Sequence, residues 1–275
     1  CAFIIIFLIG AKDDILPMSP YRKLLGQIFA CFILVFKAQV RITSLYGIFG
    51  VYEIPVIISI ILSMFTILVI INAFNLIDGI NGLSGSLATL ISLSMGTWFF
   101  LIDRTELAII AFSLAGACIA FLRYNITPAR IFMGDTGSML IGLVSAIMVI
   151  EFIEIHSDIQ GSPYAFKAVP AVAVGILILP LFDTLRVFIM RLLNGKSPLH
   201  ADRNHIHHLL LDSGLTHMRA TMVLVGVNLL FILFTVYFQD LGNLGLLIIL
   251  LLLASVLTAI PYVISRSRNQ QRLSN

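Results

Sequence analysis

An acidic side chain beside a glycine-rich turn is the first place in this sequence where chemistry could occur. Asp135 lies in the run Ile131-Phe132-Met133-Gly134-Asp135-Thr136-Gly137-Ser138, and uncharged residues then continue as far as Glu151. A carboxylate at the start of such an apolar helix is costly to leave unpaired in lipid, whereas beside water it meets free backbone N–H groups. Asp135 is therefore either a helix cap or a ligand that holds a metal cation next to phosphates.

A second group of polar residues lies in the segment 72–83. Asn72, Asn75 and Asp78 recur every three residues, so in a helix they fall near one face. Their oxygens suit a hard cation such as Mg²⁺, which needs only one or two protein ligands beside phosphates and water. The alternative is a polar seam between two helices.

Two adjacent carboxylates, Asp13 and Asp14, form a third candidate site. They repel each other unless they share a cation or a proton, and the nearby Arg22 and Lys23 could supply positive charge for a phosphate group. The alternative is an acidic pair at the membrane interface that has no chemical role.

The fourth candidate is the histidine-rich run His200-Ala201-Asp202-Arg203-Asn204-His205-Ile206-His207-His208. It has no Cys, no HExxH and no paired zinc-finger spacing, so it does not indicate zinc. Imidazoles beside an arginine fit recognition of a diphosphate and of hydroxyl groups, and the alternative is a solvated basic loop. Upstream, Asp183 and Arg186 are three residues apart, which predicts a structural ion pair on a helix.

The composition requires helices that span a membrane. Hydrophobic residues make up 59% of the 275 residues, charged residues make up 11%, and the mean hydropathy is +1.05. A soluble domain cannot bury that much apolar side chain, so we expect an all-α, polytopic transmembrane helix bundle. Lys and Arg form no basic stripe, which argues against nucleic acid as a partner. Cys1, Cys31 and Cys118 are far apart and form no disulfide framework.

We expect about nine membrane segments. Residues 1–10 are apolar but too few to cross a bilayer, so we interpret them as the second half of a truncated first segment. The other expected spans lie near 22–40, 54–74, 82–102, 105–122, 136–155, 166–190, 218–238 and 241–264. We expect residues 1–265 to form one transmembrane domain and residues 266–275 to form a cytoplasmic tail.

The basic residues predict the orientation. If the end that bears Asp13 and Asp14 is cytoplasmic, only four of the 17 Lys and Arg residues fall outside, and the C-terminus is cytoplasmic. Those four residues are Lys37, Arg41, Arg104 and Lys167. The same alternation brings all four candidate sites to the cytoplasmic face, which favours the metal-binding interpretation of Asp135.

The order of these motifs resembles that of the polyprenyl-phosphate N-acetylhexosamine-1-phosphate transferase superfamily, the glycosyltransferase family 4 type. The matching segments are Asp13-Asp14 with Lys23, Asn72–Leu83, Asn125–Ser138, Asp183–Arg186 and His200–His208. The last of them is similar to the loop of bacterial undecaprenyl-phosphate GlcNAc-1-phosphate transferases. The phospho-MurNAc-pentapeptide transferase is the alternative, but its His triplet followed by Phe-Glu is absent here.

The resemblance implies a reaction at the cytoplasmic face of the bacterial plasma membrane. An N-acetylhexosamine-1-phosphate passes from a UDP-sugar to undecaprenyl phosphate, UMP is released, and a cell-envelope glycan is begun. The resemblance also implies Mg²⁺ as the cofactor, because members of this superfamily use it.

The resemblance assigns roles by motif. Asn75 and Asp135 would bind the metal, Asp13 and Asp14 would handle the lipid phosphate, and Asp78 belongs to the same catalytic group. Lys23 would offset phosphate charge. Asn81 would lie near the uracil, although relatives often have Asp there. The residues expected to face the sugar and the diphosphate are Asp202, Arg203, His205, His207 and His208.

Two other classes fit the composition, namely a membrane transporter and an inactive fragment. A transporter needs ionisable residues across the membrane midplane, whereas here they cluster on one face, apart from Asp183. The sequence leaves open the UDP-sugar, the downstream glycan and whether the chain forms a homodimer.

Overall fold

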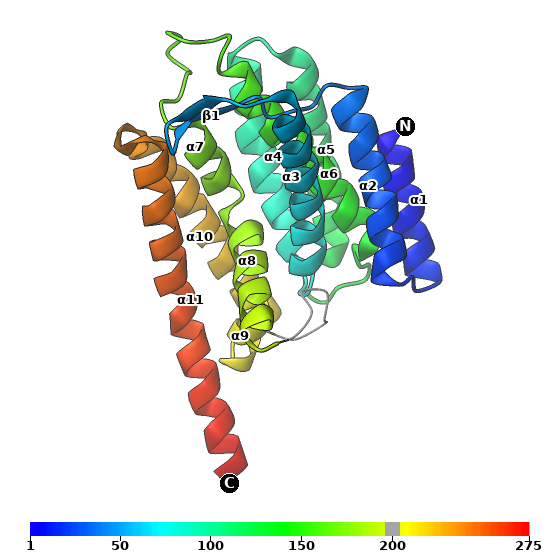
Figure 1. Cartoon of the computed structure of the whole chain (residues 1–275). Helices are drawn as coiled ribbons and strands as arrows, with labels where there is room; N and C mark the ends of the chain where they lie inside the picture. The colour runs from blue at the N-terminus through cyan, green and yellow to red at the C-terminus, as the bar shows by residue number, and fades with distance from the viewer. Residues whose placement is uncertain (196–203, 275) are drawn as a thin grey trace.

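The computed structural model describes the backbone of residues 1–195 and 204–274, and the side chains as far as residue 264. The described residues form helices joined by short loops, with one β-hairpin (Figure 1). The helices are α1 (Ala2–Ile15), α2 (Pro20–Phe36), α3 (Val56–Ile77), α4 (Leu83–Leu101), α5 (Thr105–Asn125), α6 (Gly134–Ile155), α7 (Val169–Ile176), α8 (Ile178–Leu193), α9 (Ile206–Asp212), α10 (His217–Tyr237) and α11 (Gly242–Ser274). The hairpin pairs β1 (Ser44–Ile48) with β2 (Val51–Glu53), and a short 3₁₀ helix, η1 (Gln239–Leu241), precedes α11.

The predicted polytopic helix bundle is confirmed. Within the described residues, six helices are long and apolar enough to cross a membrane, and a seventh span is counted if α7 and α8 form one bent segment. The six are α3, α4, α5, α6, α10 and the apolar part of α11 with η1. Helices α1 and α2 have 14 and 17 residues, fewer than the roughly 20 that cross a bilayer. Helix α11 continues to Ser274, past residue 265 where we expected the membrane domain to end.

The span expected near 166–190 is broken in its middle. Its two halves, α7 and α8, meet at Leu177 with a bend of 82°. Pro180 has no N–H to donate to Ile176 and therefore cannot continue α7. Asn228 of α10 binds the backbone groups freed at the break: its Nδ2 donates to the Ile176 carbonyl at 3.1 Å, and its Oδ1 accepts the Leu179 N–H at 3.3 Å. A break inside a membrane span is tolerated only when such partners satisfy the backbone.

Helix α6 is the most enclosed of the spans, with 83% of its most apolar stretch buried against 22% for α5. Two glycines let its neighbours approach closely. A Cβ added at Gly142 would lie 2.6 Å from the Ile71 Cα of α3, and one added at Gly10 of α1 would lie 2.5 Å from the Thr136 Cα. Helices α1, α3 and α6 are therefore packed tightly enough to hold polar groups in a defined arrangement.

The hairpin and the candidate site lie at opposite ends of α6. Thr43, just before β1, donates its N–H to Glu154 Oε1 at 2.8 Å, and the Tyr46 hydroxyl donates to the Ile153 carbonyl at 2.6 Å. Both acceptors belong to the last turn of α6, whereas Asp135 is in its first turn. In Figure 1 the hairpin covers one end of the bundle, and α9 lies at the other end.

Candidate active site

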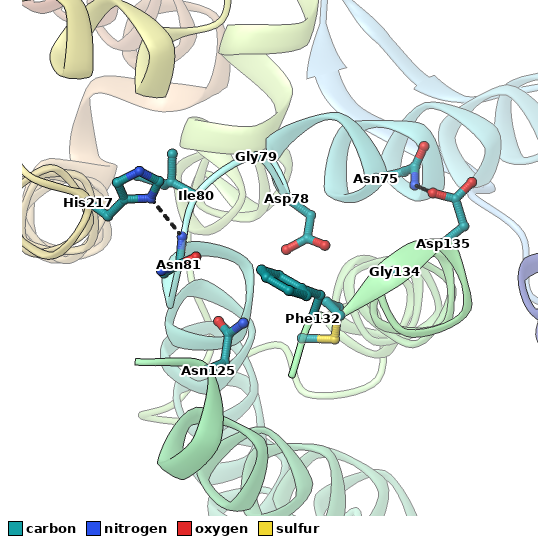
Figure 2. A pocket seen from close by; sticks show the side chains of 11 residues that line it. Asn75, Asp78, Gly79, Ile80, Asn81, Asn125, Phe132, Gly134, Asp135 and His217 are labelled. Carbon is teal, nitrogen blue, oxygen red and sulfur yellow. Dashed lines mark hydrogen bonds between the residues drawn. The ribbon is translucent and has the colours of Figure 1, made fainter. Parts of the chain in front are cut away.

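A cavity of about 380 Å³ opens at the end of the bundle where α3 ends and α6 begins (Figure 2). Its walls come from three parts of the chain: the end of α3 with the following loop, the segment from the end of α5 to the first residues of α6, and the first residue of α10. The lining residues are Asn75, Asp78, Gly79, Ile80, Asn81, Asn125, Phe132, Met133, Gly134, Asp135 and His217.

The N-terminus of α6 is capped by a residue of another helix. Asp14 of α1 accepts the backbone N–H groups of Asp135 at 2.8 Å and Thr136 at 3.0 Å, and also the Thr136 hydroxyl at 2.5 Å. These N–H groups have no partner within α6, and the positive end of the helix favours a carboxylate. Asp14 therefore satisfies the helix terminus, and the side chain of Asp135 is left for other contacts.

The side chain of Asp135 takes part in a cluster of charges. Lys23 Nζ forms an ion pair with Asp135, donates to Asn75 Oδ1 at 3.1 Å and lies 3.5 Å from Asp13 Oδ2. Asn75 Nδ2 donates to Asp135 Oδ1 at 2.8 Å (Figure 2) and to Ser138 Oγ at 3.0 Å, which turns its Oδ1 toward the lysine. Oxygens from α1, α3 and α6 thus surround the ammonium group of Lys23.

This oxygen cluster has the donor chemistry of a Mg²⁺ site. Carboxylate and amide oxygens suit Mg²⁺, which keeps several water or phosphate ligands of its own. In residues 1–195 and 204–274 no group of three or more His, Cys, Asp or Glu side chains could enclose a metal alone. Asn75 and Asp135 can therefore supply two ligands, and a bound diphosphate would have to complete the coordination.

Asn72 does not share this site, although it was expected near the same helix face. Its amide exchanges hydrogen bonds with Gln27 of α2 and donates to the Leu68 carbonyl. The polar seam that we considered as an alternative for this segment is correct for Asn72. Asn75 also bonds to a neighbouring helix, but its partners on α6 include Asp135, the other proposed metal ligand.

Asp78 follows the last residue of α3, and its carboxylate points toward Phe132 in the cavity (Figure 2). It accepts a hydrogen bond from the Ser84 hydroxyl at 2.5 Å. Burial raises the pKa of Asp78 to about 6, and the negative charges of Asp135 and Asp14 add to this rise. The carboxyl group therefore changes its charge just below neutral pH.

The loop after Asp78 is held from several sides. The Asn81 N–H donates to His217 Nδ1 at 3.4 Å, and its carbonyl accepts from the Thr221 hydroxyl at 2.9 Å. Gly82, at φ +80°, donates its N–H to Asn125 Oδ1 at 2.7 Å. Opposite this loop, Phe132 is 77% exposed. The cavity therefore combines fixed amide groups with one accessible aromatic face.

Three polar or aromatic side chains that line the cavity, those of Asn125, Phe132 and His217, were given no role from the sequence. Asn125 and Phe132 stand inside motifs that we singled out, so their position was a usable signal. His217 is the first residue of α10 and belongs to none of those motifs. We find no sequence signal that distinguishes it from an ordinary histidine at a helix end.

The described part of the histidine-rich run lies beside the cavity but does not line it. His205 and His207 are buried, and His208 is partly buried. The expected ion pair between Asp183 and Arg186 is confirmed, with Arg186 Nη2 2.9 Å from Asp183 Oδ1. Asp202 and Arg203 lie outside the described residues. Substrate contacts by the whole run remain a prediction.

Fold and site together define a polytopic membrane protein with a polar cavity at one end of its helix bundle, lined by two residues, Asn75 and Asp135, that also bind the Lys23 ammonium. Residues 1–153, more than half of the chain, match the model of Glycosyl transferase family 4. The chain belongs to this family, as the motif order predicted.

Several curated proteins resemble the chain over a similar region. The decaprenyl-phosphate N-acetylglucosaminephosphotransferase of Mycolicibacterium smegmatis is 35% identical over 160 residues, which is 56% of this chain and 39% of that protein. A probable undecaprenyl-phosphate N-acetylglucosaminyl 1-phosphate transferase of Bacillus subtilis is 34% identical over 53% of this chain and 37% of its own length. The undecaprenyl-phosphate alpha-N-acetylglucosaminyl 1-phosphate transferase of Escherichia coli is 31% identical over 50% and 36%. The matched part of the chain thus spans less than two fifths of the length of each of these relatives.

Proposed function

We propose that this protein transfers an N-acetylhexosamine-1-phosphate, in the first instance GlcNAc-1-phosphate, from a UDP-sugar to a polyprenyl phosphate and releases UMP. The observation that carries the proposal is the cluster of Asp135, Asn75 and Asp13 around the Lys23 ammonium, next to the cavity that Asn75 and Asp135 line. The names of the three relatives, which describe polyprenyl-phosphate GlcNAc transferases, support the choice of substrates.

The reaction joins two anions, so the residues must mainly align them and offset their charge. An oxygen of the lipid phosphate attacks the phosphorus that carries the sugar. The bridging P–O bond breaks, and its electron pair leaves with UMP. Because the attacking oxygen is already anionic, the step needs no strong base.

Asn75 and Asp135 are the residues that would hold Mg²⁺, since their oxygens already bind a positive charge, the ammonium of Lys23. When bound, the metal would draw charge from the diphosphate of the nucleotide sugar. Lys23 supplies a second positive charge at the same place and can offset the negative charge that passes from the attacking lipid phosphate to the departing UMP.

Asp13 and Asp14 receive different roles in this proposal. Asp14 accepts hydrogen bonds from the N-terminal N–H groups of α6, so it orients the segment that carries Asp135. Asp13 faces Lys23 and is the carboxylate that remains for the lipid phosphate. Exposed apolar side chains of α1 and α2, among them Ile15 and Leu25, would face the lipid near this point.

The other side of the cavity suits the nucleotide. Phe132 offers an exposed flat face on which a base can stack, and the Asn81 and Asn125 amides lie beside it (Figure 2). The distribution of basic residues supports a cytoplasmic position for this end of the bundle, where a soluble nucleotide sugar meets a membrane lipid.

The test is a radiolabel assay with the purified protein, undecaprenyl phosphate and several UDP-sugars, with and without Mg²⁺. We expect labelled lipid and UMP to form only with Mg²⁺, and Asp135→Ala to abolish both products. Asp158→Asn, which changes an exposed carboxylate at the hairpin end of the bundle, is the matched control and should retain full activity. Flux of a substrate across vesicles without sugar-phosphate transfer would instead favour a transporter.

A further inference from the structure

A ring of the histidine-rich run packs directly on the backbone of the cavity loop. A Cβ added at Gly79 would lie 2.0 Å from His207 Nε2 and within 2.8 Å of two neighbouring ring carbons. Gly79 is not among the glycines with positive φ, so its backbone conformation alone does not exclude a side chain. The contact with His207 is what requires glycine at this position.

The surroundings of His207 fit a packing role better than contact with a charged substrate. The residue is 1% exposed and does not line the cavity. Its Nδ1 is buried and has no hydrogen-bond partner among the described residues. Burial lowers the pKa of His207 to about 3, and neighbouring histidines contribute to the shift, so the ring is neutral at physiological pH. A neutral, enclosed imidazole cannot offset the charge of a diphosphate.

A buried carboxylate holds this ring in place. Asp183 of α8 is 2% exposed; its Oδ1 accepts the Ile206 N–H at 2.9 Å, and its Oδ2 lies 2.8 Å from His205 Nδ1. Arg186 donates both to Asp183 Oδ1 and to the Asn204 carbonyl, which ties the same stretch to α8 a second time. The His205 and His207 rings are nearly parallel, with centroids 5.7 Å apart.

We propose that His207 is a positioning residue that supports the backbone of Gly79, and that Asp183 holds His207 there. Through Gly79 this support sets the positions of Asp78, which precedes it, and of Asn81, which is two residues further on; both line the cavity. The inference rests on the transferase function proposed above. It gives His207 a role different from the substrate contact expected from the family resemblance.

The first experiment separates packing from chemistry at His207. Replacement by Phe keeps a flat ring of similar size against Gly79, whereas replacement by Ala removes it. We expect His207→Phe to retain at least a third of the wild-type kcat and the wild-type pH profile, and His207→Ala to lower kcat at least tenfold. Equal loss in both variants would overturn the proposal, because a ligand or a proton carrier is lost equally in both.

The second experiment is a double-mutant cycle between the two partners. Gly79→Ala should lower the melting temperature in detergent and lower kcat more than tenfold, because the new methyl group meets the ring. Adding His207→Ala should restore part of both losses, since it removes the obstacle. Gly116→Ala is the matched control, because nothing lies within 4 Å of a Cβ added there.

The melting temperatures keep this inference distinct from the proposed function. If the wild-type protein shows no transfer, the transferase proposal fails. The melting temperatures of the double-mutant cycle still show whether His207 and Gly79 are in contact. Additive losses in both melting temperature and kcat would show that the two residues do not interact, and would overturn the inference even in an active enzyme.

Discussion

The ammonium of Lys23 is paired with the carboxylate of Asp135 across the interface between α2 and α6. Asn75 Oδ1 accepts from the same ammonium, so the lysine contacts both residues that we propose as ligands of Mg²⁺. A protein cation and a metal cation cannot share these oxygens at full strength. Binding of the metal should therefore move Lys23 away from Asp135 and toward the substrate phosphates.

Lys23→Met should strengthen binding of Mn²⁺, used as a spectroscopic substitute for Mg²⁺, in the absence of substrates. Removing one positive charge a few ångströms from the site lowers the repulsion of the metal, and we expect a gain of about tenfold in affinity. Electron paramagnetic resonance titration of free Mn²⁺ measures it. Transferase activity should fall, because the phosphates lose a counter-charge. Lys167→Met is the control, since that lysine pairs with Asp240 at the other end of the bundle. An unchanged Mn²⁺ affinity in Lys23→Met would refute competition.

Replacing the two adjacent carboxylates should have different consequences. Asp14→Ala leaves two backbone N–H groups at the start of α6 without their acceptor, and loss of a helix cap costs about 1 to 2 kcal/mol. We expect a lower melting temperature as well as lower activity. Asp13→Ala should lower activity with a smaller thermal effect, because Asp13 accepts one backbone N–H, from Met18. Thermal unfolding in detergent and the radiolabel assay separate the two, and equal thermal losses would contradict the assignment of Asp14 as the cap.

Asp78 should make stability depend on pH. Its pKa of about 6 in the folded protein lies above the ordinary value of 3.8, so the folded state binds more protons than the unfolded state between these values. The contribution of Asp78 to stability is therefore most favourable below pH 3.8 and is lost as the pH rises through about 6. Asp78→Asn should remove this dependence.

Melting curves at pH 5 and pH 7.5 test the sign. The difference in melting temperature between Asp78→Asn and the wild type should shift in favour of the variant when the pH is raised from 5 to 7.5. A shift in favour of the wild type would show that the fold stabilises the charged form of the carboxylate. If the ionised carboxylate is the active form, wild-type turnover should also decline below about pH 6.

Asn228 should be essential for the bend between α7 and α8. Asn228→Leu keeps a side chain of similar size but leaves the Ile176 carbonyl and the Leu179 N–H unpaired inside the bundle. An unsatisfied buried polar group costs about 1 to 3 kcal/mol, so we expect a clear drop in melting temperature. The bend also places Asp183, so activity should fall too. Asn194→Leu, at an exposed helix end, is the control. A variant with the wild-type melting temperature would mean that water or lipid headgroups satisfy the break.

The sequence could predict the class of protein because membrane spanning depends on local properties. The length and apolarity of each span follow from the residues alone, so the polytopic bundle and most of its spans were predicted correctly. The hairpin of residues 44–53 was not expected, because two short strands leave a weak pattern between long apolar helices. The motif order was also readable, and it led to the correct family.

The sequence by itself determined which residues are available for chemistry: the oxygens of Asn75 and Asp135, the Lys23 ammonium and the acidic pair. Only the tertiary structure decided how they are used. Asp13 and Asp14 are neighbours in the chain, but successive residues of a helix point about 100° apart, so one faces Lys23 and the other caps α6. The support of Gly79 by His207 is also a tertiary feature, because a contact between residues more than 100 positions apart depends on how α8, α9 and α3 pack. Such partners are set by packing in three dimensions, and no local pattern in the sequence encodes them.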